Sequence, residues 1–272
     1  HWLPMMLAGD TIGAYCLSEP HSGSDASALS TQAAIDVDGF IINGQKAWIT
    51  HGDLADFYNV MVRTGESGAN GISCLLVAAG TPGLSFAPRE LKMGAWASPT
   101  AGVIFDDVRV GPDHLIGTED GGFRIAMAAL DAGRLGIAAC AVGLAQGALD
   151  AATTYAQQRR QFGRPIAQFQ GLSFMLADMD TAISAARALY LDAARRKDDG
   201  VEFGVAAAKA KLFATDTAMK VANDALQVLG GYGYTRDFPL ERYFREAKML
   251  QIVEGTNQVQ RMVIGRALTD TS

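Results

Sequence analysis

One carboxylate near the end of this chain is a candidate for proton-transfer chemistry. Glu254 follows the apolar pair Ile252 and Val253 and precedes Gly255, and polar residues typical of a helix start come next. Burial among apolar neighbours disfavours the charged form of a carboxylate, so its pKa rises and it accepts a proton more readily. A glutamate here can equally face solvent or favour the positive end of a helix dipole. From these residues alone, both interpretations of Glu254 stay open.

A second segment, residues 15–25, combines groups that could face a ligand. It reads Tyr-Cys-Leu-Ser-Glu-Pro-His-Ser-Gly-Ser-Asp, so an apolar approach ends in hydroxyls, small residues and two carboxylates. Gly23 permits close approach of the backbone, and the hydroxyls of Ser18 and Ser24 suit a ring edge or a phosphate oxygen. A hydroxyl-rich loop that only caps strands has a similar composition. The segment is therefore a candidate binding loop that needs support from elsewhere.

Composition restricts the class of protein. A chain of 272 residues with 49% hydrophobic content can form one large domain or two ordinary ones. The net charge of -6, with charges mixed along the chain, argues against nucleic-acid binding. The three separate cysteines indicate a reducing compartment and no metal site. Because no signal peptide begins the chain and no uncharged apolar run approaches membrane-spanning length, we expect a cytoplasmic protein without a membrane span.

Strand-like patterns dominate the chain up to Gly117. Short apolar runs are separated by turns that contain glycine and proline, which is typical of a compact antiparallel barrel or sandwich. The dipeptide Asn43-Gly44 is the one that best fits a tight hairpin turn, so we expect a hairpin there. The expected strands are residues 39–42, 45–50, 57–63, 72–78 and 103–110.

Helical periodicity replaces the strand pattern after Gly117. Leu172, Met175, Met179 and Ile183 recur at the three-to-four-residue spacing of one helical face. The sequence therefore predicts a multidomain α+β protein, with a β-barrel or sandwich domain of residues 1–117 and an up-down four-helix bundle of residues 118–272. The expected helices are residues 121–158, 166–197, 204–229, 240–252 and 258–268.

Two glycine- and aromatic-rich stretches are poor candidates for nucleotide recognition on their own. Residues 230–234 have the composition of a phosphate loop, but they lack the G-x-G-x-x-G register and follow a predicted helix, so they form no Rossmann fingerprint. Residues 232–243 are rich in aromatic side chains, yet the acidic balance of the chain favours packing and turn formation over base stacking.

Several segments together resemble the signatures of the acyl-CoA dehydrogenase family. Residues 15–25 look like the first signature, residues 46–50 like the flavin-edge strand, and residues 227–248 like the second signature. The run 254–258, with Arg261 beyond it, is similar to the catalytic segment. The family has an N-terminal helical domain, a middle β domain and a C-terminal four-helix bundle. The resemblance implies that this chain holds the last two domains, as a fragment, a processed form or a natural truncation.

The resemblance implies an FAD site. Trp48 would cover the flavin ring, although a packed strand tryptophan is the alternative. Arg159 and Gln170 match positions that bind FAD from a neighbouring subunit, so a homotetramer built as a dimer of dimers would complete the site; taken alone, Arg159 resembles a solvated charge. The implied FAD-binding residues are Tyr15, Cys16, Leu17, Ser18, Ser24, Trp48, Ile49, Thr50, Arg159, Gln170, Gln227, Val228, Leu229, Gly230, Gly231, Thr256, Asn257 and Gln258.

The resemblance also implies a substrate and a reaction. The matching substrate positions are Ser24, Asp131, Arg134 and Gly255, although Asp131 and Arg134 at a spacing of three can also form a simple helical ion pair. Glu254 would remove the α proton of an acyl-CoA while hydride leaves the β carbon for flavin N5, which gives an enoyl-CoA of the kind made in β-oxidation of fatty acids. Some relatives place the base near Gly133 instead, so a carboxylate at Glu254 favours straight-chain or short branched substrates.

Alternatives to a dehydrogenase stay open at this point. A flavoprotein oxidase or monooxygenase on the same scaffold would pass electrons to oxygen, and it differs only in access of the acceptor. A truncated chain could also act only as an assembly module. In the family, the usual electron acceptor is electron-transfer flavoprotein, which makes that protein the expected partner.

Overall fold

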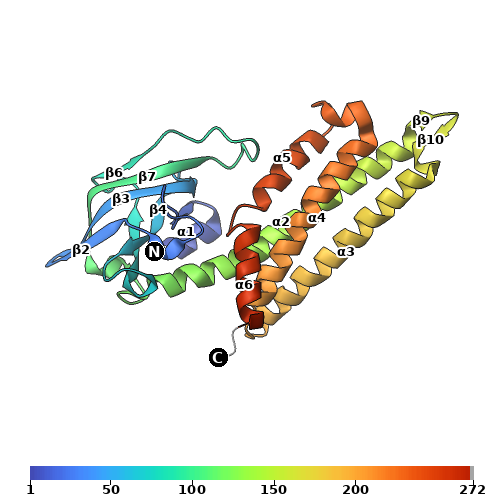
Figure 1. Ribbon diagram of the computed structural model, residues 1–272. Helices are drawn as coiled ribbons and strands as arrows, with labels where there is room; N and C mark the ends of the chain where they lie inside the picture. The colour runs from blue at the N-terminus through green and yellow to red at the C-terminus, as the bar shows by residue number, and fades with distance from the viewer. Residues whose placement is uncertain (270–272) are drawn as a thin grey trace. The chain divides into compact units, whose positions relative to one another are not determined.

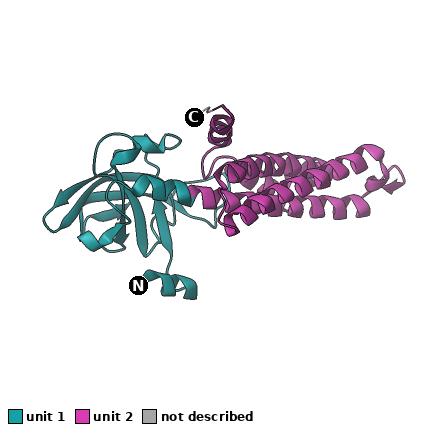
Figure 2. Ribbon diagram, turned by 90° about the horizontal axis from the view of Figure 1, so that it is seen from below, with its two compact units in different colours: residues 1–129 teal, residues 130–272 magenta. Residues whose placement is uncertain are grey.

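The computed structural model describes residues 1–269, and the chain divides into two compact units (Figure 2). Unit 1 comprises residues 1–129, and unit 2 begins at Leu130. The last strand of the sheet ends at Ile116, next to the domain boundary that we predicted after Gly117. That boundary stays a prediction, because the first helical turns after it belong to unit 1.

Unit 1 is built on one eight-stranded sheet (Figure 1). Its strands follow the order β6-β7-β3-β2-β4-β5-β8, and β1 pairs with β4 outside this path. A short helix, α1 (Trp2–Ala8), precedes the sheet. The strands are β1 (Gly13–Cys16), β2 (Gln32–Asp36), β3 (Gly39–Thr50), β4 (Phe57–Arg63), β5 (Ile72–Ala78), β6 (Leu84–Phe86), β7 (Thr100–Val110) and β8 (Leu115–Ile116).

The hairpin that we predicted at Asn43-Gly44 is wrong. Strand β3 runs without interruption through both residues, and the turn lies earlier, between Asp36 and Gly39. The pairing of β3 with β7 shifts its register between Ile42 and Gly44, which marks a bulge. Gly44 has a φ of 147°, and a β-carbon there would lie 2.7 Å from the Cα of Thr31. An Asn-Gly pair suits positive φ in a bulge as well as in a turn, so the dipeptide alone does not distinguish them.

The sheet is mixed and not purely antiparallel as we expected. Strands β1 and β2 both run parallel to β4, with Gly13 opposite Phe57 and Gln32 opposite Arg63. Strand β5 occupies the other edge of β4 along its whole length. Residues 17–31 therefore leave the sheet and return to the same edge of the same strand.

Unit 2 consists of helices. Helix α2 (Gly122–Gln158) starts before the unit boundary, and a small hairpin of β9 (Arg160–Gln161) and β10 (Arg164–Pro165) follows it. The other helices are α3 (Gln170–Asp198), α4 (Gly204–Leu229), α5 (Leu240–Leu250) and α6 (Asn257–Thr269), as Figure 1 shows. The four helices of the predicted bundle correspond to α2–α5, and α6 packs on α4. Helix α3 begins at Gln170 and not at Ile166, because Phe169 is extended and residues 166–168 form a 3-10 turn.

Small residues line the buried faces of the long helices, and α3 and α5 approach α4 closely. Alanines of α2 and α4 are fully buried at helical spacing, among them Ala138, Ala145, Ala214 and Ala218. Met179 and Ile183 of α3 complete this core, as their spacing predicted. A helix lined with alanine offers little volume to fill, so its neighbours must come near. The packed helices of unit 2 therefore hold the loops at their ends in fixed positions.

Helix α2 is long and apolar enough to cross a membrane by length and composition. An 18-residue window within it has a mean hydropathy of 1.6. Our expectation concerned uncharged runs, and every window of this length in α2 contains a charged residue. A helix in the core of a globular domain passes the same test, and the alanines of α2 contribute to the core of unit 2.

Candidate active site

Glu254 lies in a short turn between α5 and α6. Helix α5 ends at Leu250 and α6 begins at Asn257. Glu254 and Gly255 both have positive φ values, of 55° and 82°. A left-handed conformation is unfavourable for a residue with a β-carbon, so Glu254 keeps it only because surrounding contacts hold the turn. The turn is therefore a strained segment that carries the candidate base.

Burial and two cations act in opposite directions on Glu254. Its side chain is half-buried, and burial raises its pKa above the usual 4.5. The positive charges of Arg134 and Lys211 oppose this rise. A carboxyl group with a raised pKa is a stronger proton acceptor once ionised, and the nearby cations keep the ionised form accessible. These are the properties that a general base requires.

Three side chains hold the backbone carbonyls of the turn. The guanidinium Nε of Arg134 donates to the carbonyl of Glu254 at 3.4 Å. The amide Nε2 of Gln260 donates to the carbonyls of Glu254 and Gly255, at 3.2 and 2.8 Å. The ammonium of Lys211 donates to the carbonyl of Gly255 at 2.9 Å. Helices α2, α4 and α6 thus fix the turn together.

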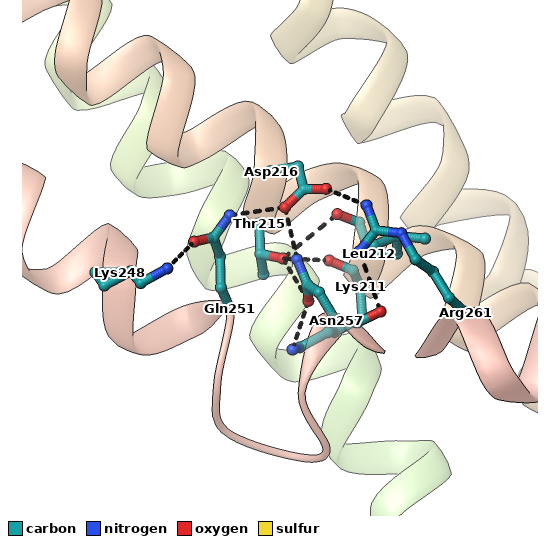
Figure 3. A network of polar contacts seen from close by, with 8 residues as sticks. All are labelled: Lys211, Leu212, Thr215, Asp216, Lys248, Gln251, Asn257 and Arg261. Atoms are coloured by element: carbon teal, nitrogen blue, oxygen red, sulfur yellow. Dashed lines mark hydrogen bonds and ion pairs between the residues drawn. The ribbon is translucent and has the colours of Figure 1, made fainter. Parts of the chain in front are cut away.

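A polar network centred on Asp216 of α4 pins both ends of the turn (Figure 3). The Asp216 carboxylate accepts hydrogen bonds from Gln251 and Asn257 at 2.7 Å each. Arg261 forms an ion pair with it at 3.1 Å. The amide N–H of Asn257 also donates to the carbonyl of Gln251 at 3.0 Å. The two ends of the turn, Gln251 and Asn257, are therefore held together.

The structure shows what the side chain of Asn257, a predicted FAD-binding residue, contacts within the chain. Asn257 is buried. Its side-chain amide nitrogen donates to Thr215 and Asp216, and its side-chain oxygen accepts a hydrogen bond from Lys211. All of these partners lie inside unit 2, so the side chain supports the turn, and its predicted role in FAD binding stays a prediction. Thr256 is half-buried, and its hydroxyl accepts from the Val259 amide in the first turn of α6, while Gln258 is exposed.

Arg134 joins two of the predicted substrate residues to the turn. It pairs with Asp131 at 2.6 Å within α2, which confirms the helical ion pair, and it also contacts the Glu254 carbonyl. Burial raises the pKa of Asp131, and Arg134 opposes that rise. Gly133 lies between them, and a β-carbon at that position would be 2.8 Å from the carboxyl carbon of Glu254. The carboxyl group therefore fills the space that a side chain at 133 would take.

A cavity of about 560 Å³ gathers most of the predicted nucleotide-binding residues of unit 2. Arg159 and residues 227–231 line it, together with Tyr155 and Tyr232. The Arg159 guanidinium lies 5.8 Å from the centre of the Tyr232 ring. A β-carbon at Gly230 or Gly231 would meet open space. A fixed positive charge beside bare backbone and an aromatic ring suits a nucleotide diphosphate.

Not every predicted residue contributes directly to this cavity. Val228 and Leu229 are buried and offer little more than their backbone. Gln170 is exposed at the start of α3 and is not among the residues that line the cavity. Among residues 1–269, no cluster of three or more histidine, cysteine or acidic side chains could hold a metal ion.

In unit 1 the predicted flavin-edge strand alternates between exposed and buried side chains. Trp48 is 65% exposed and Thr50 is exposed, whereas Ile49 between them is buried. Trp48 also has a positive φ of 62°, at an irregularity in the pairing of β3 with β7. A large exposed ring on a strained strand is unusual for a residue that only packs. Trp48 and Thr50 are thus available to a ligand.

The predicted loop after β1 contains both accessible and buried residues. Ser24 is exposed and Ser18 is half-buried, while the Tyr15 hydroxyl donates to the carbonyl of Ala126 at 3.3 Å. Leu17 is 6% exposed. Cys16 has no exposed surface, and burial raises the pKa of its thiol to about 12. The side chain of Cys16 belongs to the core of the sheet, and its predicted place in the FAD site stays a prediction.

A buried ion pair between the same loop and strand β3 was missed by sequence reasoning. The Lys46 ammonium lies 2.7 Å from Glu19, and both side chains are buried. The Glu19 carboxylate also accepts hydrogen bonds from the backbone amides of Ser30 and Thr31, at 2.7 and 2.9 Å. These bonds tie the start of the 17–31 loop to its end. Glu19 and Lys46 therefore shape the loop and are not available as acid or base.

Comparison with known proteins agrees with both units. A family model described as "Acyl-CoA dehydrogenase, middle domain" matches residues 14–108, and "Acyl-CoA dehydrogenase, C-terminal domain" matches residues 120–269. An acyl-CoA dehydrogenase of Bacillus subtilis (strain 168) is 48% identical over 268 residues, which cover 98% of this chain and 71% of the relative. The chain belongs to the acyl-CoA dehydrogenase family. The resemblance drawn from its segments is thereby confirmed.

Solved structures of this family share the fold. Butyryl-CoA dehydrogenase from Megasphaera elsdenii aligns with a TM-score of 0.97 and 45% identity, over 99% of this chain and 71% of that chain. A structure described as the electron transferring flavoprotein of Acidaminococcus fermentans aligns with a TM-score of 0.97 and 50% identity, over 98% of this chain and 71% of that chain. The predicted α+β fold class, a β-sheet domain followed by a helical domain, is confirmed.

The residues that hold the Glu254 turn of this acyl-CoA dehydrogenase homologue were not identified from the sequence. Lys211 and Thr215 are buried polar residues on the alanine-rich α4, and Gln260 has no exposed surface on α6. The available signal was a lysine and a threonine four residues apart within a helical face of small apolar residues. Such a pattern indicates a buried polar network, because an unpaired lysine is rarely buried.

Proposed function

We propose that this chain is an FAD-dependent acyl-CoA dehydrogenase in which Glu254 removes the α proton of the substrate. The observation that carries the proposal is the half-buried Glu254 carboxyl, with its raised pKa, on a turn fixed from three helices. The product would be a trans-2-enoyl-CoA. A positioned general base supplies roughly 10²- to 10⁴-fold in rate.

The donor set of the chain fits FAD, which members of the family bind. Arg159 offers a permanent charge for a diphosphate, and Gly230 and Gly231 leave open backbone beside it. Trp48 and Thr50 present a ring and a hydroxyl in unit 1. When bound, FAD supplies the acceptor for the hydride that leaves the β carbon of the substrate.

The residues of the chain would bind and orient the thioester. Clamping the turn fixes the backbone amides near Glu254, which we propose donate to the thioester carbonyl and so stabilise the charge that develops on its oxygen. Gly255 would lie beside the thioester, and Ser24, Asp131 and Arg134 would serve the substrate as predicted. Arg134 does so by its bond to the turn and its pairing with Asp131.

The substrate and partners follow from the relatives. The match to butyryl-CoA dehydrogenase and the carboxylate at Glu254 favour a short straight-chain or short branched acyl-CoA, within fatty-acid β-oxidation. The structure described as an electron transferring flavoprotein supports such a flavoprotein as the electron acceptor. We further propose a cytoplasmic homotetramer, a dimer of dimers, in which Arg159 and Gln170 reach the FAD of a neighbouring subunit.

A visible spectrum tests the proposal. The purified chain, loaded with FAD, is mixed with butyryl-CoA without oxygen, and we expect the flavin absorption band to bleach. Glu254→Gln is expected to keep the bound flavin and to lose its bleaching. Unchanged bleaching in Glu254→Gln would rule out this residue as the base. Rapid peroxide formation in air would favour an oxidase, and a chain that stays colourless with added FAD would favour an assembly module.

A further inference from the structure

A buried lysine lies directly beneath the turn that carries Glu254. Lys211 of α4 has no exposed surface. The other buried residues on this helix are mostly alanines. Lys211 donates to the carbonyl of Gly255 at 2.9 Å. It also donates to the side-chain oxygen of Asn257 at 2.9 Å (Figure 3). Burying an ammonium is costly unless it is hydrogen-bonded. Both of its partners belong to the turn or to the first residue after it.

Charged groups on α2, on α4 and on the turn act on Lys211. Arg134 approaches from α2, Asp216 lies on α4 itself, and Glu254 lies on the turn. Burial and the positive charge of Arg134 lower the pKa of Lys211 to about 8, although the two carboxylates oppose this fall. At neutral pH the side chain is therefore still charged. It places a positive charge close to Glu254, whose pKa it lowers.

Peptide geometry connects the lysine to the orientation of the turn. In a trans peptide, the carbonyl of one residue points opposite to the N–H of the next. Holding the Gly255 carbonyl toward α4 therefore directs the N–H of Thr256 away from α4. In the same way, Gln260 and Arg134 hold the carbonyl of Glu254, and this directs the N–H of Gly255 away from these two side chains. A clamp on these two carbonyls thus fixes the Glu254 backbone in its left-handed conformation.

We propose that Lys211 is a positioning residue for the candidate base: its bonds to Gly255 and Asn257 fix the Glu254 turn, and its charge favours the ionised carboxylate. This inference rests on the proposed role of Glu254. Gln260 also donates to the Gly255 carbonyl, but it carries no charge. Of these two residues, only Lys211 can favour the ionised form of Glu254 by its charge.

The test compares Lys211→Met with Lys209→Met in the FAD-loaded chain. Lys209 lies on the same helix, two residues away, and is exposed. The rate of flavin reduction by butyryl-CoA is measured against pH in a stopped-flow spectrometer, together with KM. For Lys211→Met we expect a loss of ~10²-fold in rate, the effect of a small misplacement of a catalytic group. The acid limb of its pH profile should also move to higher pH, with little change in KM.

The shift of the acid limb separates positioning from general damage to the fold. A purely structural role for Lys211 would lower the rate without moving that limb. Lys209→Met should match the unsubstituted chain in both quantities. If Lys211→Met behaves like Lys209→Met, or if its rate falls with the acid limb unmoved, the inference is overturned.

A second variant covers the case in which Lys211→Met does not fold. Lys211→Gln keeps an amide donor but removes the charge, and we expect it to bind FAD and to show the same movement of the acid limb. If neither variant yields folded, flavin-loaded protein, the lysine is a requirement of the fold and the inference fails.

A readout without flavin separates this inference from the proposed function. The lowered pKa means that Lys211 itself binds its proton more weakly in the folded chain than in the unfolded chain between about pH 8 and 10.5, so its contribution to stability should rise across that range. The buried thiols of Cys16 and Cys74 act in the opposite direction, equally in all variants, so the rise is measured as the difference in stability from Lys211→Met. Lys211→Met should lack this rise in urea unfolding, whereas Lys209→Met should keep it. If butyryl-CoA reduces no flavin in the unsubstituted chain, the proposed function fails, while this measurement still tests the buried, charged lysine; absence of the rise would contradict it.

Discussion

The carboxyl group of Glu254 occupies the space that a side chain at Gly133 would need. A β-carbon built at Gly133 would lie 2.8 Å from the Glu254 carboxyl carbon, with one carboxylate oxygen nearer still. The two residues are 121 positions apart, yet they exclude each other sterically. A carboxylate at position 254 of the turn therefore requires glycine at position 133 of α2.

Gly133→Ala should displace Glu254 and slow flavin reduction. The added methyl group cannot fit beside the carboxyl, so the base must move, and a displacement of about 1 Å costs ~10²-fold in rate. Gly136→Ala is the matched control, because a β-carbon at Gly136 meets nothing within 4 Å on the same helix. That control should keep the rate and gain stability of about 0.5–1 kcal/mol, as alanine does in helices. Equal rates in the two variants would contradict the steric argument.

Flavin reduction should follow a single acid limb whose midpoint lies above pH 4.5. Only the ionised Glu254 accepts a proton, and burial raises its pKa above that value. The same shift acts on stability: the folded chain binds the proton more tightly, so the free energy of unfolding falls as pH rises from 4.5 through the folded pKa. Urea unfolding of the chain and of Glu254→Gln across this range measures the difference. A variant that keeps the fall would show that another group causes it.

Asp216→Ala should loosen the turn and weaken the fold of unit 2. The change leaves Gln251, Asn257 and Arg261 without their shared acceptor. Because Asp216 is partly exposed, the loss should be about 1–2 kcal/mol in urea unfolding, at the low end for a hydrogen-bonded group. Asp224→Ala, which removes a surface pair with Lys220 on the same helix, is the control. A control that loses as much stability would contradict the pinning role.

Lys46→Met should destabilise unit 1 strongly. Removing one member of a buried ion pair leaves the other charge uncompensated, which costs about 3–5 kcal/mol. Burial raises the pKa of Glu19, but Lys46 and the hydrogen bonds outweigh it and bring the pKa to about 2. The stabilisation is therefore present above pH 4.5 and is lost as pH falls toward 2. Thermal unfolding at several pH values tests this, with the exposed pair of Arg109 and Asp36 as a control that should matter little.

Arg159→Met should weaken FAD binding. The charge lost from the cavity contributes a charge-assisted hydrogen bond to a diphosphate, which corresponds to an affinity loss of roughly 10- to 100-fold. Fluorescence titration of the apoprotein with FAD measures it. Arg195→Met, outside the cavity on α3, should leave the affinity unchanged. An unchanged affinity in Arg159→Met would remove this residue from the proposed site.

The sequence predicted the elements better than their connections. Strands at 57–63 and 72–78 and the helix at 204–229 appear with the expected bounds, because local periodicity decides them. The parallel pairing of β1 and β2 with β4 could not be predicted in the same way, since it depends on which segments meet in space. Asn43-Gly44 failed for a similar reason: its preference for positive φ fits two different structures.

The candidate site shows the same division. Glu254 was a candidate from its own neighbours and became the expected base through the family resemblance, but the groups that hold it were not identified. Arg134 is 120 positions away, and Lys211 reaches Gly255 across 44 positions. Cys16 and Asn257 were assigned to a cofactor by their place in a motif, and the motif did not show that both side chains are buried or that Asn257 is hydrogen-bonded within the chain. Motifs locate a site, and packing decides which of their residues face it.

The loop of residues 17–31 has a consequence for how this protein can change. It leaves and rejoins the same edge of β4, and Glu19 ties its two ends together through the amides of Ser30 and Thr31. Its tip, around Ser24, can therefore be lengthened, shortened or cut without shifting any strand by one residue. Insertions there should be tolerated where insertions in β3 are not, so the loop is a natural point for diversification of ligand contacts and for grafting of new sequences.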